Sequence, residues 1–437
     1  MKTTKLFFMA ALALMTAACS NDDNDLTQQP AKAEGIPFTA TISLDQSATT
    51  RALTENGTTI EATWATGEKV ALIHNGVKDE MTVSAVNAGV ATINGTITGS
   101  PSGGDAVTII YPSDAADGTT GNVKSDWLSS QVGTLKGTSG TSIEEKYDVR
   151  KGSGALNASG TSLDGTVSLT NQNAIFKLTL KDIDGTNDVS ATSVVISDQT
   201  GVVTTVTPAP ATNVMYVALP TTATTLKFLV TGSDSKKYFN MASSLSLGAS
   251  YYQSTVKLAT VGDVILSTGK CAKAGTSGAV AKICYLGDET GESAYNYTNG
   301  LALALSDANG GNSCKWKTSN TDAGHTKQAS STFTEESGLQ YNDATHNSDT
   351  YPAFKYAIAN NGTAAPTGCS SWFLASGYQW KKMISAAGLS NLGFQSGRYW
   401  SSTEGSADNA WCFRSNDGSW SSNGEASAYR VRACLAF

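Results

Sequence analysis

The sequence predicts a mainly β protein in which two different kinds of domain are joined, and three observations support this. Thr, Ser, Gly, Ala and Val are abundant and charged residues make up only 15% of the 437 residues, which suits strands joined by polar turns. Short alternating apolar segments recur before residue 260, with almost no helical periodicity. Beyond residue 260, six of the eight tryptophans and six of the seven cysteines gather.

The chain opens with a stretch that is typical of a secretory signal. Two lysines precede an apolar run over residues 6–15, which is too short to span a bilayer. Cys19 follows two alanines, so we expect a lipoprotein signal over residues 1–19 with a lipid on Cys19. Ordinary cleavage nearby is the alternative. The membrane would hold the precursor only through its acyl chains, since no later segment approaches the length of a spanning helix.

The charge and residue counts exclude several classes of function. The net charge of −7 leaves no basic field to attract nucleic acid or an anionic membrane, so we expect neither as a partner. Only three histidines occur, which argues against a multi-histidine metal site. No nucleophile triad, phosphate loop or carboxylate pair stands out. We therefore predict no enzyme, no catalytic residue, no metal and no cofactor.

The first part of the chain is predicted to form short strands. Clusters of Gly, Asn, Asp and Ser separate them, a pattern that favours β-sandwiches. A polar Gly/Ser stretch near residues 152–163 would divide one sandwich over residues 52–160 from a second over residues 161–260. The expected strands are residues 36–44, 106–111, 167–170, 174–180, 194–196, 215–219 and 226–230.

The segment before the first sandwich combines an acidic tether with a strand, over residues 20–51. Residues 20–25 are rich in Asn and Asp and are typical of a disordered linker. The strand that follows places five apolar side chains on one face because strand side chains alternate. These five are Ile36, Phe38, Ala40, Ile42 and Leu44. Next comes Arg51, the only arginine before Arg150.

An ordered series of short motifs follows the signal and tether. It runs TTRA, TWATGEKV, IYP, AIFKL, YVALP and GASYY, from residue 49 to residue 252. This order resembles the fimbrillin family, the lipoprotein-derived subunits of type V pili. The similarity covers about half of the chain, and it implies two transthyretin-like β-sandwiches in tandem.

The resemblance also implies a way of assembly. In fimbrillins an arginine-specific protease cuts the precursor after its first strand, and a strand from another subunit refills the groove. Here the cut would fall between Arg51 and Ala52 and would remove the lipid anchor together with residues 36–44, whose five apolar side chains would be the plug. The alternative is that Arg51 is a surface residue in a turn.

The C-terminal part, residues 261–437, has a different pattern. Strands are expected at residues 264–266 and 278–285, the apolar run 300–305 is undecided, and residues 377–384 have the spacing of a short helix. The motifs WFLAS, YWSST, NAWCF and VRACLAF resemble C-type-lectin-like modules at the C-termini of bacterial surface adhesins. This resemblance implies an α+β fold.

The calcium-sugar motifs of animal lectins are absent, so calcium-dependent sugar binding is not expected. Trp420 lies in a polar loop and could stack on a ligand, with Arg414, Asn416 and Asp417 as polar companions. The alternative for Trp420 is a place in the core, which is the reading that we favour for the tryptophans at positions 372, 380, 400 and 411.

The cysteines of this part are even in number and belong to an exported segment, which argues for disulfides. They are Cys271, Cys284, Cys314, Cys369, Cys412 and Cys434. Sequence leaves about 15 pairings open. We favour Cys271 with Cys284 across a hairpin, and Cys412 with Cys434 on neighbouring strands.

These observations and resemblances predict the tip subunit of a type V pilus, which assembles by strand exchange after proteolysis and adheres through its C-terminal module. The terminal strand reaches Phe437 without a donor extension, which favours the tip. Its partners would be other pilus subunits and a glycan or protein on a host or bacterial surface. The location would be the cell surface, first as an outer-membrane-anchored lipoprotein precursor. The alternatives are a surface lipoprotein that binds glycan or protein without polymerising, and an oxidase of the formylglycine-generating kind, whose fold is related.

Overall fold

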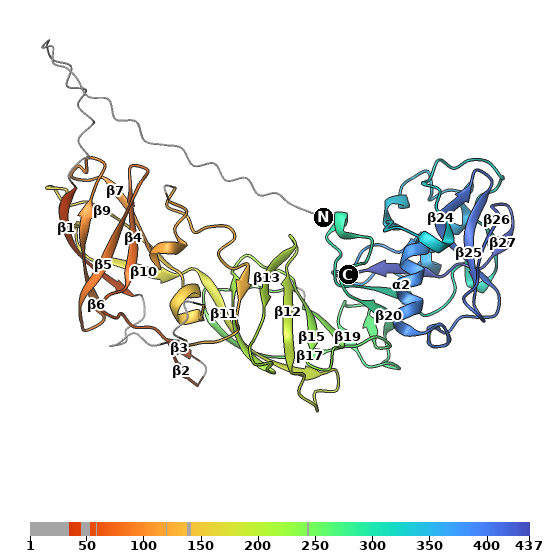
Figure 1. The fold of residues 1–437 in the computed structure, drawn as a ribbon, viewed down its shortest axis with the longest axis horizontal. Helices are drawn as coiled ribbons and strands as arrows, with labels where there is room; N and C mark the ends of the chain where they lie inside the picture. Colours follow the sequence, from red (N-terminus) through yellow and green to blue (C-terminus); the bar gives the residue numbers. More distant parts are fainter. Residues whose placement is uncertain (1–34, 45–52, 58, 119, 138–140, 243) are drawn as a thin grey trace, which may run out of the picture.

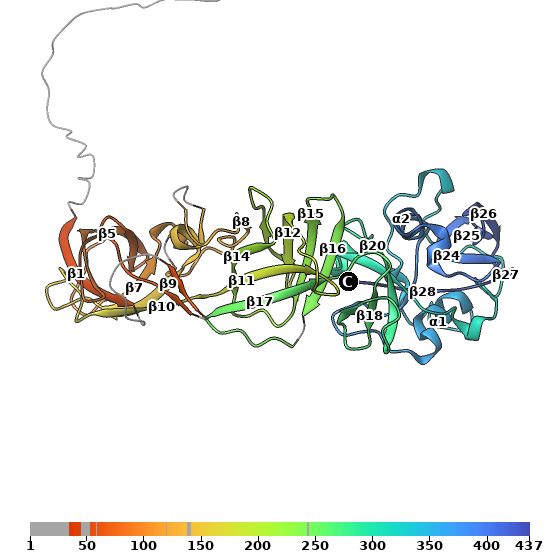
Figure 2. The same ribbon diagram turned by 90° about the horizontal axis from the view of Figure 1, so that it is seen from below.

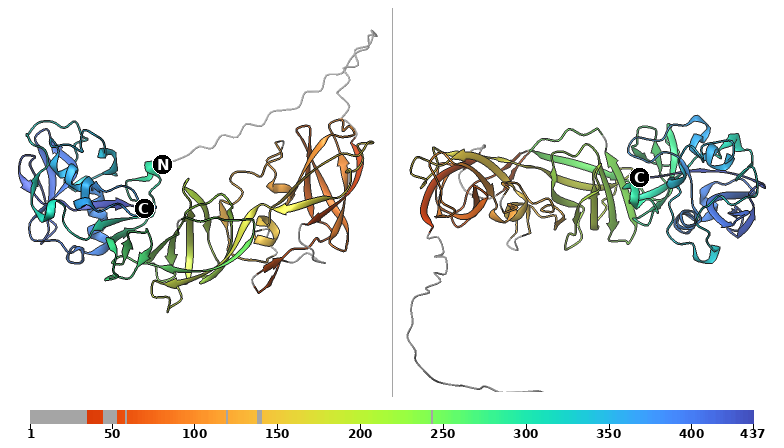
Figure 3. Two further views of the ribbon diagram at one scale, coloured as in Figure 1. Left: turned by 180° about the vertical axis from the view of Figure 1, so that it is seen from behind. Right: turned by 90° about the horizontal axis from the view of Figure 1, so that it is seen from above.

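The computed structural model describes residues 35–44, 53–57, 59–118, 120–137, 141–242 and 244–437, and the structural statements below concern these residues. Three units lie in a row along the long axis of the molecule (Figure 1). A β-barrel is at one end, a β-sandwich is in the middle and an α+β unit is at the other end (Figure 2). The views from behind and from above show the same row (Figure 3).

The first unit is a closed barrel of seven strands in the order β1-β10-β9-β7-β4-β5-β6. Their bounds are β1 Ile36–Leu44, β4 Lys69–His74, β5 Val77–Asn87, β6 Val90–Ile97, β7 Ala106–Tyr111, β9 Arg150–Ala155 and β10 Val167–Asn171. Asn75 and Gly76, both with positive φ, turn β4 into β5, as a two-residue hairpin loop requires. A β-sandwich was expected here, and its sheet instead closes into a barrel because β1 bonds to β6 on one side and to β10 on the other.

The second unit is a sandwich of two sheets, with strand orders β14-β11-β17 and β16-β15-β12-β13-β8. Its strands are β8 Ser130–Gln131, β11 Asn173–Asp182, β12 Ala191–Ser197, β13 Val202–Val206, β14 Val214–Pro220, β15 Leu226–Gly232, β16 Lys237–Ala242 and β17 Tyr251–Leu258. Only Gln172 separates β10 from β11, so the two units meet there, later than the expected boundary at residue 160. Strand β8 also reaches into this sandwich from the segment that joins β7 to β9.

The third unit is α+β and contains the six-stranded sheet β19-β18-β20-β21-β28-β23. These strands are β18 Val264–Leu266, β19 Cys271–Ala272, β20 Ala279–Leu286, β21 Gly300–Ala304, β23 Phe373–Leu374 and β28 Ala433–Ala436. A three-stranded sheet holds β24 Arg398–Ser406, β25 Asn409–Arg414 and β26 Trp420–Gly424, and β22 Cys314–Lys315 pairs with β27 Ala428–Tyr429. The strands expected at residues 264–266 and 278–285 are confirmed, the second with each end shifted by one residue, and the undecided run is a strand.

Two α-helices belong to this third unit, α1 Pro352–Ala359 and α2 Gly377–Ala387. Helix α2 confirms the predicted helix. Ser376 and Gln379 form a capping box at its start, which satisfies two backbone amides that a helix otherwise leaves unpaired. Its apolar face places Trp380 and Met383 in the core, and both are fully buried.

Short elements complete the described chain. The hairpin β2 Thr54–Asn56 and β3 Thr59–Glu61 follows β1. A π-helical turn covers Ile143–Tyr147. The 3-10 turns are Ser113–Ala115, Ser293–Tyr295, Asn309–Gly311, Ser330–Thr332, Leu339–Tyr341, Asn360–Gly362 and Leu389–Leu392.

The second and third units share one apolar cluster. Phe239 of β16 and Phe437 lie with ring centroids 4.5 Å apart, and both rings are fully buried. Leu229 and Met241 of the sandwich belong to the same cluster as Ile265 of the α+β unit. Burial of shared apolar surface makes this junction a packed joint, so the third unit is a continuation of the second.

Candidate functional site: the first strand and its groove

Strand β1 coincides with the predicted removable strand and lies between two neighbours. It pairs antiparallel with β6 from Ile36↔Ile97 to Ser43↔Val90, and parallel with β10 from Ile42↔Val167 to Leu44↔Leu169. The Thr39 amide also donates to the carbonyl of Thr161 at 3.2 Å. Strand β1 is therefore an integral member of the barrel, and its departure would leave two unpaired strand edges.

The five predicted plug residues do not contribute equally. Phe38, Ala40 and Ile42 are at most 4% exposed and belong to the barrel core. Leu44 is half-buried and contacts both this core and the apolar cluster at the junction with the second unit. Ile36 is 38% exposed, so the expectation that it is buried is wrong, because it lies at the rim where the strand begins.

The predicted processing and lipidation residues, Arg51, Ala52 and Cys19, lie outside the described residues. The description resumes at Leu53, which is fully buried. Its backbone amide donates to Glu144 Oε1 at 2.8 Å. The chain just after the predicted cut is therefore tied to the helical turn that contains Glu144.

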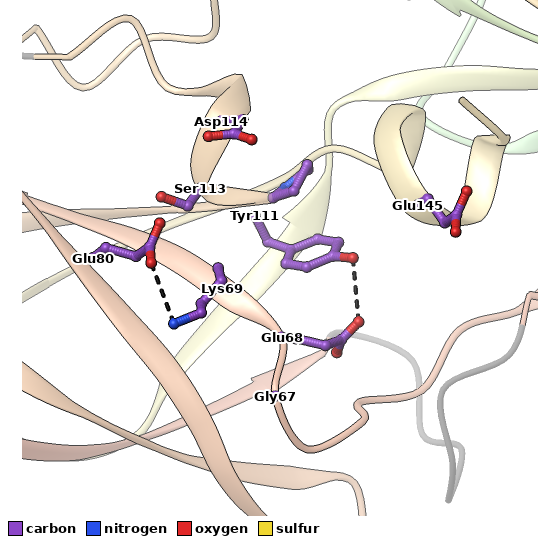
Figure 4. A pocket seen from close by; sticks show the side chains of 9 residues that line it. Gly67, Glu68, Lys69, Glu80, Tyr111, Ser113, Asp114 and Glu145 are labelled. Carbon is purple, nitrogen blue, oxygen red and sulfur yellow. Dashed lines mark hydrogen bonds and ion pairs between the residues drawn. The ribbon is translucent and has the colours of Figure 1, made fainter. Parts of the chain in front are cut away.

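A polar pocket of about 260 Å³ opens between this turn and the barrel (Figure 4). Lys69 lies 3.3 Å from Glu80, and the Tyr111 hydroxyl donates to Glu68 at 3.2 Å. The lining holds four carboxylates and one lysine, so the pocket is negatively charged. It is lined by Gly67, Glu68, Lys69, Glu80, Tyr111, Pro112, Ser113, Asp114 and Glu145.

The predicted ligand-binding group on the third unit lies at the β25–β26 turn. Arg414, Asn416 and Asp417 are exposed, and Arg414 pairs with Asp417 at 3.7 Å. Trp420 is half-buried because its ring packs edge-on against Phe333, with ring centroids 4.8 Å apart. The structure thus brings the four predicted residues to one turn, with one side of the indole used in packing.

The other tryptophans of this unit mostly lie in the core, as predicted. Trp372, Trp380 and Trp400 are at most 2% exposed. Trp411 is half-buried and its ring nitrogen donates to the Gln328 carbonyl at 2.6 Å.

All six late cysteines are free thiols, so neither favoured disulfide pairing is found. Cys271 on β19 and Cys284 on β20 are separated by β18, and they belong to different apolar clusters. Cys412 on β25 and Cys434 on β28 lie in different sheets. Burial raises the pKa of the Cys284, Cys314 and Cys369 thiols to about 12, so these groups are protonated at neutral pH.

The third unit also contains buried polar groups that the sequence did not predict. His325 and His346 face each other with their Nε2 atoms 2.9 Å apart, and His346 Nδ1 lies 2.8 Å from Asp343. Burial lowers the pKa of His325 to about 4. Glu425 is fully buried beside Glu404, and burial followed by this neighbouring charge raises its pKa to about 8. Asp343 and His346 are close in the sequence, but His325 lies 21 residues before His346 and Glu404 lies 21 residues before Glu425, so no short spacing pattern identified these two contacts.

Asp307 forms a second buried network in this unit. It pairs with Arg432 at 2.5 Å and with Arg430 at 3.4 Å, and it accepts a 2.8 Å hydrogen bond from the Tyr399 hydroxyl. Arg432 directly precedes β28 and Arg430 lies two residues earlier, so the network fixes the approach to that strand.

Metal-binding clusters and membrane-spanning helices are both absent from the residues that the structure describes. In this part of the chain, no three His, Cys, Asp or Glu side chains gather in a way that could hold a metal ion. Over the same residues, every helix is too short or too polar to cross a bilayer.

No protein-family model and no curated protein matches the chain. Among solved structures, it is similar to a fimbrial protein from Bacteroides ovatus, with 14% identity, a TM-score of 0.32, and 93% of this chain and 100% of that one covered. A fimbrial assembly protein from Parabacteroides distasonis is similar at 11% identity with a TM-score of 0.28, over 51% of this chain and 90% of its own.

Proposed function

We propose that this chain is a fimbrillin-like subunit of a surface pilus, in which a cut after Arg51 releases β1 and a strand from a neighbouring subunit takes its place. The observation that carries this proposal is the position of β1. It is the first described strand, it is hydrogen bonded on both sides, and it buries Phe38, Ala40 and Ile42 in a single core.

The physical chemistry of an exchange follows from these contacts. A barrel without β1 has free backbone groups along β6 and β10 and an apolar groove where three side chains were. A strand that alternates apolar and polar residues as β1 does can bond to these backbone groups and fill the groove. The refilled barrel regains the ladder and the buried area that it lost, which drives assembly.

The α+β unit would form the outer end of the subunit. It lies at the opposite end of the row from β1 (Figure 2). Strand β28 lies between β21 and β23, and Phe437 is packed against Phe239, so this strand is not a free donor. These positions support a place at the pilus tip, with adhesion to a glycan or protein through the lectin-like unit and its turn around Trp420.

The precursor would reach the cell surface as a lipoprotein, with the lipid on Cys19 and with other pilus subunits as its later partners. The oxidase alternative needs a reactive cysteine pair. The raised pKa values of the Cys284 and Cys369 thiols disfavour it.

One observation favours the second candidate, a surface lipoprotein that keeps its lipid and binds glycan or protein without polymerising. The pairing of β1 with β6 covers eight positions, so the uncut strand is held firmly. In that case the surface form would start at a lipid-blocked Cys19 and not at Ala52.

The test is to treat the purified precursor with an arginine-specific protease and to follow both its new N-terminus and its state of assembly. We expect a start at Ala52 and the appearance of polymers. Arg51→Gln is the matched control and should give neither. A wild-type protein that stays whole at residue 51, or that is cut there and never polymerises, would overturn the proposal.

A further inference from the structure

The hairpin β2–β3, which directly follows the predicted cut, is docked on the second unit (Figure 1). Leu53 and Ala62 flank the hairpin and are at most 3% exposed. They belong to one apolar cluster with Ile175 of β11 and Ala218 of β14. The described residues 53–57 and 59–62 thus form a strap that crosses from the sandwich toward the barrel, whose core includes Trp64.

Glu55 joins the strap to all three strands of one sheet. Its carboxylate accepts hydrogen bonds from Lys177 Nζ of β11 at 2.8 Å and from the Tyr216 hydroxyl of β14 at 2.6 Å. From β17, the Tyr251 hydroxyl donates at 2.9 Å and the Gln253 amide at 3.0 Å. The carboxylate is therefore bonded to β14, β11 and β17 together.

The arrangement of these donors follows from the register of the sheet. Lys177 is opposite Tyr216 on one side and opposite Gln253 on the other. Side chains at paired positions point to the same face, so three donors form a row that one carboxylate can reach. Charge-assisted bonds of this kind are the stronger ones.

The site strongly favours the ionised carboxylate. The hydrogen bond from Lys177, followed by that from Tyr216, lowers the pKa of Glu55 to about 2. The Glu55 side chain is 24% exposed, so solvent screens it only in part. The contact is thus present at any pH at which the protein would be exported or assembled.

We propose that Glu55 anchors the strap to the second unit when β1 leaves, so that the released segment ends at Arg51 and the hairpin stays out of the groove. This inference rests on the proposed function, since it needs the cut. A new chain end frays unless something ties it down, and Glu55 is four residues beyond the cut. A strap tied to the second unit cannot refill the groove, which stays open for a strand from another subunit.

The test compares hydrogen exchange of residues 53–62 before and after cleavage of the full-length protein by an arginine-specific protease, with N-terminal sequencing of the product. We expect wild-type protein cut at residue 51 to keep the protection of this segment. In Glu55→Gln, exchange should be at least tenfold faster after the cut, and strand exchange should be slower. Tyr251→Phe removes one of the hydroxyl donors and should accelerate exchange by a smaller factor. This variant provides the test if Glu55→Gln folds poorly.

The matched control is Asp188→Asn, which removes an exposed carboxylate that pairs with Lys181 of the same strand β11 at 2.7 Å. It should behave as wild type. Equal protection in Glu55→Gln and wild type, or loss of protection in wild type on cleavage, would overturn the inference and leave the proposed function standing. Absence of the cut would overturn both.

Discussion

Strands β1 and β28 share a local setting, since each is hydrogen bonded to a neighbour on both sides, but they differ in the number of cores that they fill. The three buried side chains of β1 lie in the barrel core, and half-buried Leu44 also contacts the apolar cluster at the junction with the sandwich. Those of β28 alternate between two cores, with Leu435 in one cluster and Cys434 in the other, and Phe437 continues into the joint with the sandwich. Because most of the surface that β1 buries lies in one core, we expect its loss to leave the rest of the molecule folded, whereas the loss of β28 would disturb two cores.

The largest loss of stability is expected from removing one buried phenyl ring, either Phe38 in β1 or Phe437 directly after β28. Phe38→Ala and Phe437→Ala should each cost about 3–5 kcal/mol, since both rings are fully buried. Hydrogen exchange should show the loss confined to the barrel in Phe38→Ala and spread over the sandwich and the α+β unit in Phe437→Ala. If Phe437→Ala destabilised the α+β unit alone, the joint between the two units would not contribute to the stability of the sandwich.

Asp307→Asn tests the anchor that precedes β28. It removes the charge that pairs with Arg432 and Arg430, which leaves two cations without their partner. Breaking a buried pair from one side costs about 3–5 kcal/mol. Urea unfolding should show this loss in the α+β unit with the barrel transition unchanged, and a loss below about 1 kcal/mol would contradict the anchoring role.

Glu425→Gln should stabilise the α+β unit at alkaline pH. The pKa of Glu425 is raised to about 8 in the folded state from an unfolded value of 4.5, so its favourable contribution is complete below pH 4.5 and is lost as the pH rises through 8. A neutral amide avoids this loss. We expect the variant to gain about 2–4 kcal/mol over wild type at pH 8 and little at pH 4.5, as measured by unfolding at both pH values. A gain in stability that does not change with pH would contradict the raised pKa of Glu425.

His325→Gln should have the smallest effect. Burial lowers the pKa of His325 to about 4 from 6.5, so the unfolded state binds the proton first and stability is lost as the pH falls from 6.5 toward 4. Wild type should lose about 2 kcal/mol between pH 7 and pH 5 through this group, and the variant should not. Thermal unfolding at both pH values measures the difference. Phe38→Ala, in the barrel, serves as the control and should keep the wild-type pH slope.

The sequence predicted much of the candidate site. The bounds of β1, its buried face and helix α2 follow from alternation and from 3.6-residue spacing, which are local properties of the chain. Closure of the barrel was not predictable, because it depends on β1 meeting β10 more than 120 residues later. The same holds for the cysteines, whose even number suggested disulfides although both favoured pairs join residues of different apolar clusters.

Alternating apolar residues, a break in composition near residue 260 and one early arginine are written in the chain itself, and they were enough to predict strands, a second kind of domain and a processing hypothesis. Contacts such as Glu55 with three strands, the facing His325 and His346, and the Phe239–Phe437 joint arise when distant segments fold together. The physical reason is range. Backbone preference and side-chain alternation act over a few residues, whereas hydrogen-bond partners and shared cores are selected by three-dimensional packing among segments tens to hundreds of residues apart.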